Sequence, residues 1–214
     1  SDLHGTVNFD GSEQSHTGTN GQTYSYKDVT VTLKGDAAYE ADETYKVTLS
    51  NAGEGSSIKS ATATGKIIND DMGYFVSVKD GQTTVVEGND GELASTTPAG
   101  TPPGTVTFKV TRECDSVTLH SPSTVAWRLS STGGDVSAVE AADVNVSGAN
   151  VQANGLTGTV EFLADETVKY ITVSLVGDGV RESQSTLALT LQPVAGDTSS
   201  TMVQAVASVT LTDD

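Results

Sequence analysis

The sequence predicts an all-β protein built from β-sandwich modules in tandem. Gly, Ser, Thr and Val are abundant among its 214 residues, whereas only 5% of the residues are aromatic. Thr and Val suit pleated strands, and Gly suits the turns between them. Apolar and polar side chains alternate in many short segments, which is the period of a half-buried strand. Turn signals separate these segments, as is typical of sandwiches.

This alternation predicts strands along the whole chain. In the first, Val29, Val31 and Leu33 fall on one face, and in the next Tyr45, Val47 and Leu49 do the same. The segment 136–146 is interpreted as a loop and a strand edge because it is rich in β-branched residues. The predicted strands cover 29–33, 44–49, 61–68, 74–78, 83–87, 105–111, 124–130, 158–162, 170–176, 186–191 and 204–212.

An internal repeat relates the two halves of the chain. "TVTLKGDAAYEADETYKVTL" (30–49) aligns without a gap with "TVSLVGDGVRESQSTLALTL" (172–191). Upstream, "GTVNF" (5–9) matches "GTVEF" (158–162), so a strand is expected at each. Downstream, each copy ends in an Asp pair. After "GTVNF" the first copy has a longer polar segment, 10–27, which we expect to be a surface loop.

The two copies differ in extent, which predicts the domain organisation. Enough residues precede "GTVEF" for three or four further strands, whereas only four precede "GTVNF". We therefore expect residues 1–71 to be the C-terminal part of one module, without its N-terminal strands, and residues 72–214 to be a whole module. An open sandwich exposes apolar faces and unpaired edges. Either another chain supplies the absent strands, or this chain is a piece of a longer polypeptide.

Charge and composition narrow the classes of partner. The net charge is −17, from 28 acidic and 11 basic residues, which disfavours nucleic acids and anionic membrane surfaces and favours cations. No apolar run reaches the length of a membrane helix, and no signal peptide is visible. Cys114 is the single cysteine, so no internal disulfide is possible. It is interpreted as a small buried residue, with an intermolecular bridge as the alternative.

The most charged stretch is the acidic turn, residues 36–43, which contains Asp36, Glu40, Asp42 and Glu43 just before a predicted strand. Closely spaced carboxylates raise each other's pKa unless a cation neutralises them. Calcium suits such a set because it takes about 6–8 oxygen ligands in a flexible geometry. The pair Asp70–Asp71 is a second source of ligands. The alternative interpretation is a solvated acidic loop.

Two stretches carry a resemblance to a known family. "GDAAYEADETYKVTLSN…ATATGKIINDD" resembles the C-terminal half of a Calx-beta domain, whose pattern runs E-G-D-E-T-F-x-V-x-L-x-N and then A-x-G-x-I-x-D-D. The stretch from "VSVKDGQTTVVEGN" to "SVTLTDD" resembles a whole domain, with "VVEG" (85–88) matching the family's V-x-E-G. The resemblance implies a seven-stranded, immunoglobulin-like antiparallel sandwich that binds Ca2+ at one rim.

The resemblance also implies two sets of metal ligands. The second set departs from the family pattern, because Gln184 and Ser185 replace the D-E pair and Arg181 adds a positive charge. We expect that site to bind fewer ions, more weakly, or none. The first set is Asp36, Glu40, Asp42, Glu43, Asp70 and Asp71, and the second is Glu87, Asp143, Asp178, Glu182, Asp213 and Asp214.

An enzyme is not expected. His4, His16 and His120 are scattered, without H-x-x-x-H spacing, and Ser and His within "GSEQSH" do not by themselves make a triad. Trp127 is interpreted as a core anchor. The segment 88–104 reads as a long exposed loop, and "NVS" (145–147) is a glycosylation sequon if the protein is secreted by a eukaryote.

The sequence therefore predicts a calcium-binding structural or adhesion module of a larger extracellular or cell-surface protein. Asp70–Asp71 end the first module and "MGYFVSV" begins the second, so calcium there would rigidify the junction. Expected partners are neighbouring modules or other copies, a separate chain completing the first module, and protein or carbohydrate ligands, with no direct membrane insertion. The alternative is a regulatory calcium-sensor domain of a membrane transporter, which would be expected to keep complete acidic sites.

Overall fold

The computed structural model describes residues 3–36, 38–86, 104–114, 121–133, 139–141, 143–176 and 183–212. The chain separates into two compact units, Ser1–Gly35 and Asp36–Asp214. The regular elements of the described residues are β-strands and one short 3-10 helix, η1 (Lys79–Gly81). No helix in these ranges is long and apolar enough to cross a membrane. The all-β prediction is confirmed.

The first unit contains a single described hairpin, in which β1 (Gln14–Thr17) pairs antiparallel with β2 (Thr23–Tyr26). The Gly18 amide donates a 2.8 Å hydrogen bond to the Gln22 carbonyl, and Gly21 has φ 76°, a conformation that favours glycine. Most side chains of residues 10–27 are exposed, as expected of a surface segment. The prediction of a loop was nevertheless wrong at its centre, where the hairpin forms.

Two strands predicted in this unit, at 5–9 and 29–33, are not formed. Val29, Val31 and Leu33 lie on one side of their segment by alternation, yet they are 56%, 42% and 54% exposed. A strand needs a neighbour to bond its backbone amides and carbonyls, and no described strand pairs with either segment. Alternation therefore identifies a segment that can join a sheet, but it does not show whether a neighbouring strand is available.

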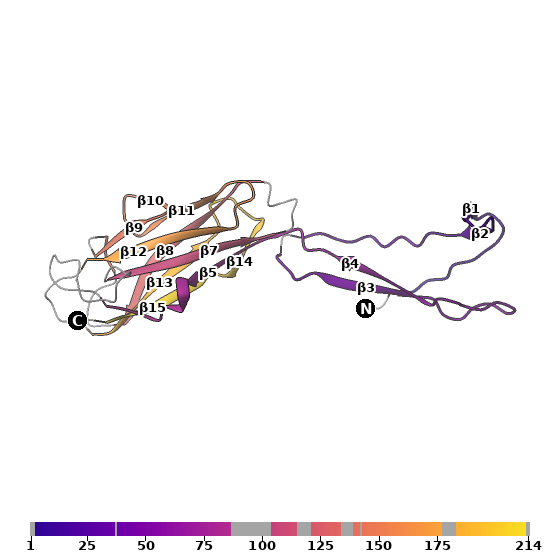
Figure 1. Cartoon of the computed structure of the whole chain (residues 1–214), viewed down its shortest axis with the longest axis horizontal. Coiled ribbons are helices and arrows are strands. Elements are labelled where there is room, and N and C mark those ends of the chain that lie inside the picture. Colours follow the sequence, from indigo (N-terminus) through magenta and orange to yellow (C-terminus); the bar gives the residue numbers. More distant parts are fainter. Residues whose placement is uncertain are drawn as a thin grey trace. The chain divides into compact units, whose positions relative to one another are not determined.

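The second unit contains a sandwich of two sheets (Figure 1). The six-stranded sheet has the order β10 (Asn150–Val151), β11 (Thr157–Phe162), β8 (Ser123–Gly133), β13 (Ser185–Gln192), β15 (Val206–Thr212) and β6 (Thr84–Val86). The five-stranded sheet has the order β14 (Ser200–Gln204), β5 (Met72–Val78), β7 (Thr105–Glu113), β12 (Val168–Leu175) and β9 (Val144–Ser147). The predicted sandwich is confirmed. Its pairing is antiparallel except that β14 pairs parallel with β5 and β15 pairs parallel with β6.

The core lies between these two sheets and follows the alternation of the sequence. On β7, Val106, Phe108 and Val110 are fully buried, and on β8 the side chain of Trp127 is 1% exposed. Residues from both sheets form one apolar cluster, as expected for sheets packed face to face. Trp127 is thus a core anchor, as predicted. Cys114, just after β7, is half-buried rather than fully buried.

A separate two-stranded sheet precedes the sandwich within the second unit. It pairs β3 (Glu43–Thr48) antiparallel with β4 (Thr62–Ile67), close to the predicted strands at 44–49 and 61–68. Residues 68–71 connect β4 directly to β5. The acidic turn leads into β3, and the Asp pair leads into β5. Both ends of the hairpin therefore lie beside predicted ligand residues.

Candidate functional site

Tyr39 fixes the acidic turn to the sandwich. Its backbone amide donates a 3.1 Å hydrogen bond to Thr201 Oγ1 on β14, and its hydroxyl donates a 2.8 Å bond to Glu113 Oε2 at the end of β7. Its ring meets the Phe75 ring of β5 edge-on, with centroids 5.8 Å apart at 86°. A Cβ at Gly73 would lie 2.7 Å from Tyr39 Cδ2, so the bare glycine makes room for the ring. Tyr39 therefore contacts three strands of one sheet.

Asp42 already has partners in this arrangement. Its carboxylate forms an ion pair with the Lys66 ammonium of β4 and accepts a 3.0 Å hydrogen bond from the Asn69 backbone amide. Lys66, and to a lesser degree the Asn69 amide, lower the pKa of Asp42. This predicted metal ligand is therefore satisfied by protein groups, and it would have to release Lys66 before it turned to an ion.

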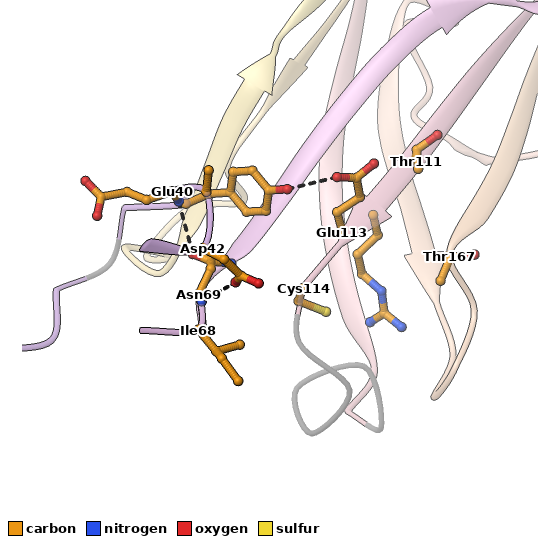
Figure 2. A pocket seen from close by; sticks show the side chains of 11 residues that line it. Glu40, Asp42, Ile68, Asn69, Thr111, Glu113, Cys114 and Thr167 are labelled. Carbon is orange, nitrogen blue, oxygen red and sulfur yellow. Dashed lines mark hydrogen bonds between the residues drawn. The ribbon is translucent and has the colours of Figure 1, made fainter. Parts of the chain in front are cut away.

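Asn69 connects the two ends of the hairpin. Its side-chain carbonyl accepts a 3.0 Å hydrogen bond from the Glu40 amide, and its side-chain amide donates a 2.8 Å bond to the Asp71 carbonyl. Figure 2 shows Asn69 between Glu40 and Asp42, with a hydrogen bond to each. One amide side chain thus holds the acidic turn to the segment that enters β5.

Two neighbouring carboxylates act on Asp71 at this place. Partial burial raises the pKa of Asp71, and the negative charges of Asp70 and Asp36 raise it further. Asp36 also accepts a 2.9 Å hydrogen bond from the Ala38 amide, which shapes the start of the acidic turn. The beginning of the turn and the Asp pair therefore share one region of negative potential immediately before β5.

A pocket of about 600 Å³ lies beside this region (Figure 2). Its wall combines the acidic turn, the residues just after β4, the end of β7 and Thr167. It contains the carboxylates of Glu40 and Glu113, the Asp42 carboxylate paired with Lys66, and Arg112. The lining residues are Tyr39, Glu40, Ala41, Asp42, Ile68, Asn69, Thr111, Arg112, Glu113, Cys114 and Thr167.

Arg112 lines the pocket and bonds the neighbouring segments to one another. It continues the inward-facing positions of β7 and is fully buried. Its guanidinium donates to the carbonyls of Ser121, Leu163 and Glu166 at 2.8–3.1 Å and to Ser123 Oγ at 2.9 Å. It also lies over the Phe162 ring, 5.3 Å from the centroid. These bonds join β8 to the loop after β11.

The structure brings only part of the predicted ligand sets together. Asp36, Asp70 and Asp71 share an electrostatic field, whereas Glu43 begins β3 with an exposed side chain. In the second set, the Asp143 carboxylate accepts a 2.7 Å hydrogen bond from the Glu140 amide. Within the described ranges, no three His, Cys, Asp or Glu side chains are placed so that they could hold a metal ion. Glu87, Asp178, Glu182, Asp213 and Asp214 lie outside the described residues.

Sequence reasoning missed the residues that assemble this region. Tyr39, Asn69 and Lys66 are not acidic, so a search for oxygen ligands passes over them. Asn69 stands directly before the Asp pair in "INDD". This position was the sequence signal that could have identified it as part of the site. The role of Gly73 has no local signal, because the ring that fills its space comes from a residue 34 positions earlier in the chain.

Comparison with known proteins identifies related sequences and folds. The family model of the Calx-beta domain matches residues 4–71 and residues 138–214, together more than half of the chain. The solved structure of an apo-form Calx CBD1 domain is 18% identical, with a TM-score of 0.41, over 68% of this chain and 99% of that one. The calcium binding domain CBD12 of CALX1.1 is 19% identical, with a TM-score of 0.40, over 65% of this chain and 44% of that one. No curated protein matches significantly.

Proposed function

Because the chain belongs to the Calx-beta domain family, we propose that it is a calcium-binding structural module in which the ion stiffens the junction between the β3–β4 hairpin and the sandwich. One observation carries this proposal. Asp36, Asp70 and Asp71 concentrate negative charge immediately before β5, and the pKa of Asp71 is raised by burial and by its two neighbours. Such mutual repulsion is what a bound cation relieves.

The residues present suit calcium in their chemistry. Carboxylate oxygens are hard donors, and calcium accepts them in irregular arrangements. Asp36, Asp70 and Asp71 would hold the ion, and Glu40 lies in the same turn. Bound calcium supplies positive charge that offsets their repulsion. The described carboxylates do not stand as a ready-made group, so binding would have to draw them together.

The structure around these acids suits a mechanical role. Residues 68–71 leave little free chain between β4 and β5. Asn69 bonds the acidic turn to the entrance of β5, and Tyr39 bonds the same turn to three sandwich strands. With the acids neutralised, these contacts hold the hairpin to the sandwich. Without neutralisation, repulsion among Asp36, Asp70 and Asp71 loosens the same contacts.

The proposed setting is outside the cell, in an adhesion or matrix protein, where the module binds but does not catalyse. The Thr-, Ser- and Gly-rich, lysine-poor composition supports this setting. Protease treatment of intact cells that express the full-length protein tests it. Digestion of the module before lysis is expected, and protection until lysis would contradict it.

Calorimetry and thermal unfolding test calcium binding. Titration with CaCl2 should release or absorb heat, and Ca2+ at 100 times its dissociation constant should stabilise the protein by about 2.7 kcal/mol. For a chain of this size that corresponds to a rise of roughly 5–10 °C in Tm. The variants Asp36→Asn and Asp71→Asn should bind more weakly.

A matched control is Asp80→Asn. Asp80 lies in η1, is ion-paired at the surface with Lys79 and has φ 55°, a conformation that asparagine tolerates. This variant should bind calcium like the wild type. Identical melting curves in calcium and in chelator, with no heat of binding, would contradict the proposal.

A further inference from the structure

Two rows of short polar side chains cross the outer face of the five-stranded sheet. Buried residues of β7, β12 and β9 alternate with these side chains, which therefore point away from the core. In one row Thr107, Thr172 and Ser147 lie side by side on adjacent strands. The second row consists of Thr105, Ser174 and Asn145. We call these six residues the polar face.

The side chains of the polar face both donate and accept hydrogen bonds. Thr107 Oγ1 and Thr172 Oγ1 lie 3.2 Å apart, and Asn145 adds an exposed amide with donors and an acceptor. Rows of this kind repeat about every 4.8 Å across the strands and about every 6.7 Å along them. A ligand that matches this pattern carries closely spaced groups that also donate and accept.

Tyr170 gives the polar face an aromatic border. It lies on β12 two residues before Thr172, on the same side of the sheet, and it is 45% exposed. β7 places Lys109 opposite it on one side. On the other side β9 has already ended, and the chain turns at Gly148 with φ 83°. A Cβ there would collide with the Tyr170 carbonyl oxygen, so a glycine is needed. The pairing of β9 with β12 therefore stops short of Tyr170.

Charge separates the polar face from the rest of the chain. The protein has a net charge of −17, yet none of the six polar-face residues is charged, and Lys109 borders them. An acidic chain repels anionic ligands such as nucleic acids. The cores of protein–protein interfaces are apolar, whereas hydroxyls dominate here. These features favour a neutral ligand that is rich in hydroxyl groups.

We propose that the polar face and Tyr170 form a binding site for a neutral polysaccharide. A pyranose ring has a face of C–H groups that packs on an aromatic ring, and a rim of hydroxyls that donate and accept hydrogen bonds. Tyr170 takes the C–H face of one sugar, and Lys109 and Thr172 bind its hydroxyls. From Tyr170 to Ser174 the strand extends about 13 Å, so the site holds more than one sugar.

This inference adds a ligand to the adhesive setting proposed above, and it does not depend on calcium. None of the proposed calcium ligands belongs to the polar face. The two proposals can therefore fail separately, and the experiment is performed in chelator to keep them apart.

Affinity electrophoresis of the full chain tests the proposal with polymers of known chemistry. Native gels contain a β-glucan, an α-glucan, a mannan or a galactan, each with chelator. Migration should be slower in at least one of these gels than in a gel without polymer. Unchanged migration in all four would overturn the proposal and would leave calcium binding untouched.

Variants of the aromatic ring locate the site. Tyr170→Ala should weaken binding roughly tenfold, because the stacking ring is lost, whereas Tyr170→Phe should bind like the wild type. Tyr24→Ala is the matched control, because Tyr24 is 48% exposed but lies in the first unit. It should bind like the wild type. Trp127 fluorescence shows that each variant is folded.

Variants of the hydroxyls complete the test. Thr172→Val replaces a hydroxyl of the polar face by a methyl group and should weaken binding several-fold. Thr190→Val, on the outer face of the other sheet, should not. Slow migration that persists in both Tyr170→Ala and Thr172→Val would overturn the proposal. So would retardation by alginate alone, which is anionic, or self-association of the chain that Tyr170→Ala abolishes.

Discussion

The hydroxyl of Tyr39 donates a 2.8 Å hydrogen bond to the carboxylate of Glu113, a residue 74 positions further along the chain. Tyr39 belongs to the acidic turn, and Glu113 ends the sandwich strand β7. The bond raises the pKa of Tyr39, because the neighbouring carboxylate disfavours the phenolate. The junction therefore has a contact that needs no metal ion and that stays protonated at physiological pH.

Removing this contact should loosen the acidic turn without unfolding the sandwich. Tyr39→Ala eliminates the ring packing on Phe75 and the bond to Glu113, so the amides of Tyr39 and Glu40 should exchange at least tenfold faster. Tyr39→Phe keeps the ring and should cost about 1 kcal/mol or less, since one partly exposed hydrogen bond is lost. Tyr26→Phe, in β2, serves as the control. Unchanged exchange in Tyr39→Ala would show that the contact is dispensable.

Gly73 should be as sensitive as Tyr39 itself. Gly73→Ala puts a Cβ 2.7 Å from the Tyr39 ring and 3.0 Å from Val203, so the ring must move. The expected result is the same faster exchange at Tyr39 and Glu40, with both side chains of the bond still present. Gly53→Ala is a matched control, because its nearest contact would be 3.9 Å away. Crystallography or NMR of Gly73→Ala with the Tyr39 ring in its original place would contradict this prediction.

The raised pKa of Asp71 predicts a pH dependence of opposite sign to that of most carboxylates. A group whose pKa is higher in the folded than in the unfolded state binds more protons when folded, so its contribution favours folding at low pH. This contribution is fully present below the unfolded value near 3.8 and is lost as pH rises through the folded value. Asp71→Asn should therefore slightly raise the Tm of the calcium-free protein at pH 7.

The pH dependence of this variant distinguishes charge repulsion at Asp71 from ordinary packing. Asp71→Asn and wild type are compared by thermal unfolding at pH 4 and pH 7, each in chelator. The difference in Tm should be larger at pH 7 than at pH 4. A variant that is less stable than wild type at pH 7 in chelator would show that the Asp71 charge is favourable.

Much of the sandwich could be predicted from the sequence, because burial on one face imposes alternation. Val106, Phe108 and Val110 are apolar since they meet the other sheet, and the same pattern is visible in the letters. The same alternation gave a wrong prediction at 29–33, where it is equally regular but no strand forms. The local sequence indicates which face of a segment can be buried. It does not indicate whether a neighbouring strand is present to pair with it, and that pairing decides whether the strand forms.

The candidate site was harder to predict from the sequence than the sandwich, for a related reason. Asp36, Asp70 and Asp71 were predicted as ligands because acidic residues that cluster in the sequence are directly visible. Their grouping depends on Asn69 and Tyr39, whose bonds join segments that are distant in sequence. Asp42 was predicted as a ligand on the same grounds, yet Lys66 from the neighbouring strand neutralises it. A cross-strand ion pair of this kind follows from register, which the acidic pattern alone does not specify.

Arg112 offers the sharpest test of how the sandwich end beside the pocket is held. Replacing it by methionine keeps an unbranched apolar stem but removes the guanidinium bonds to the carbonyls of Leu163 and Glu166 and to the hydroxyl of Ser123. Arg112 is fully buried and hydrogen bonds to a charged group contribute about 1.5–3 kcal/mol each, so the free energy of unfolding should fall by about 2–4 kcal/mol. Arg112→Lys should also destabilise, because an ammonium cannot reproduce the planar set of donors.

Chemical denaturation followed by Trp127 fluorescence measures this loss, since Trp127 is the sole tryptophan and is buried in the sandwich core. Lys109→Met on the same strand is the control. Lys109 lies between the inward-facing positions, so its loss should change stability by less than about 0.5 kcal/mol. If Arg112→Met were as stable as Lys109→Met, the guanidinium bonds to Ser121, Ser123, Leu163 and Glu166 would make no net contribution to stability. The loops around the pocket would then be held by their backbone alone.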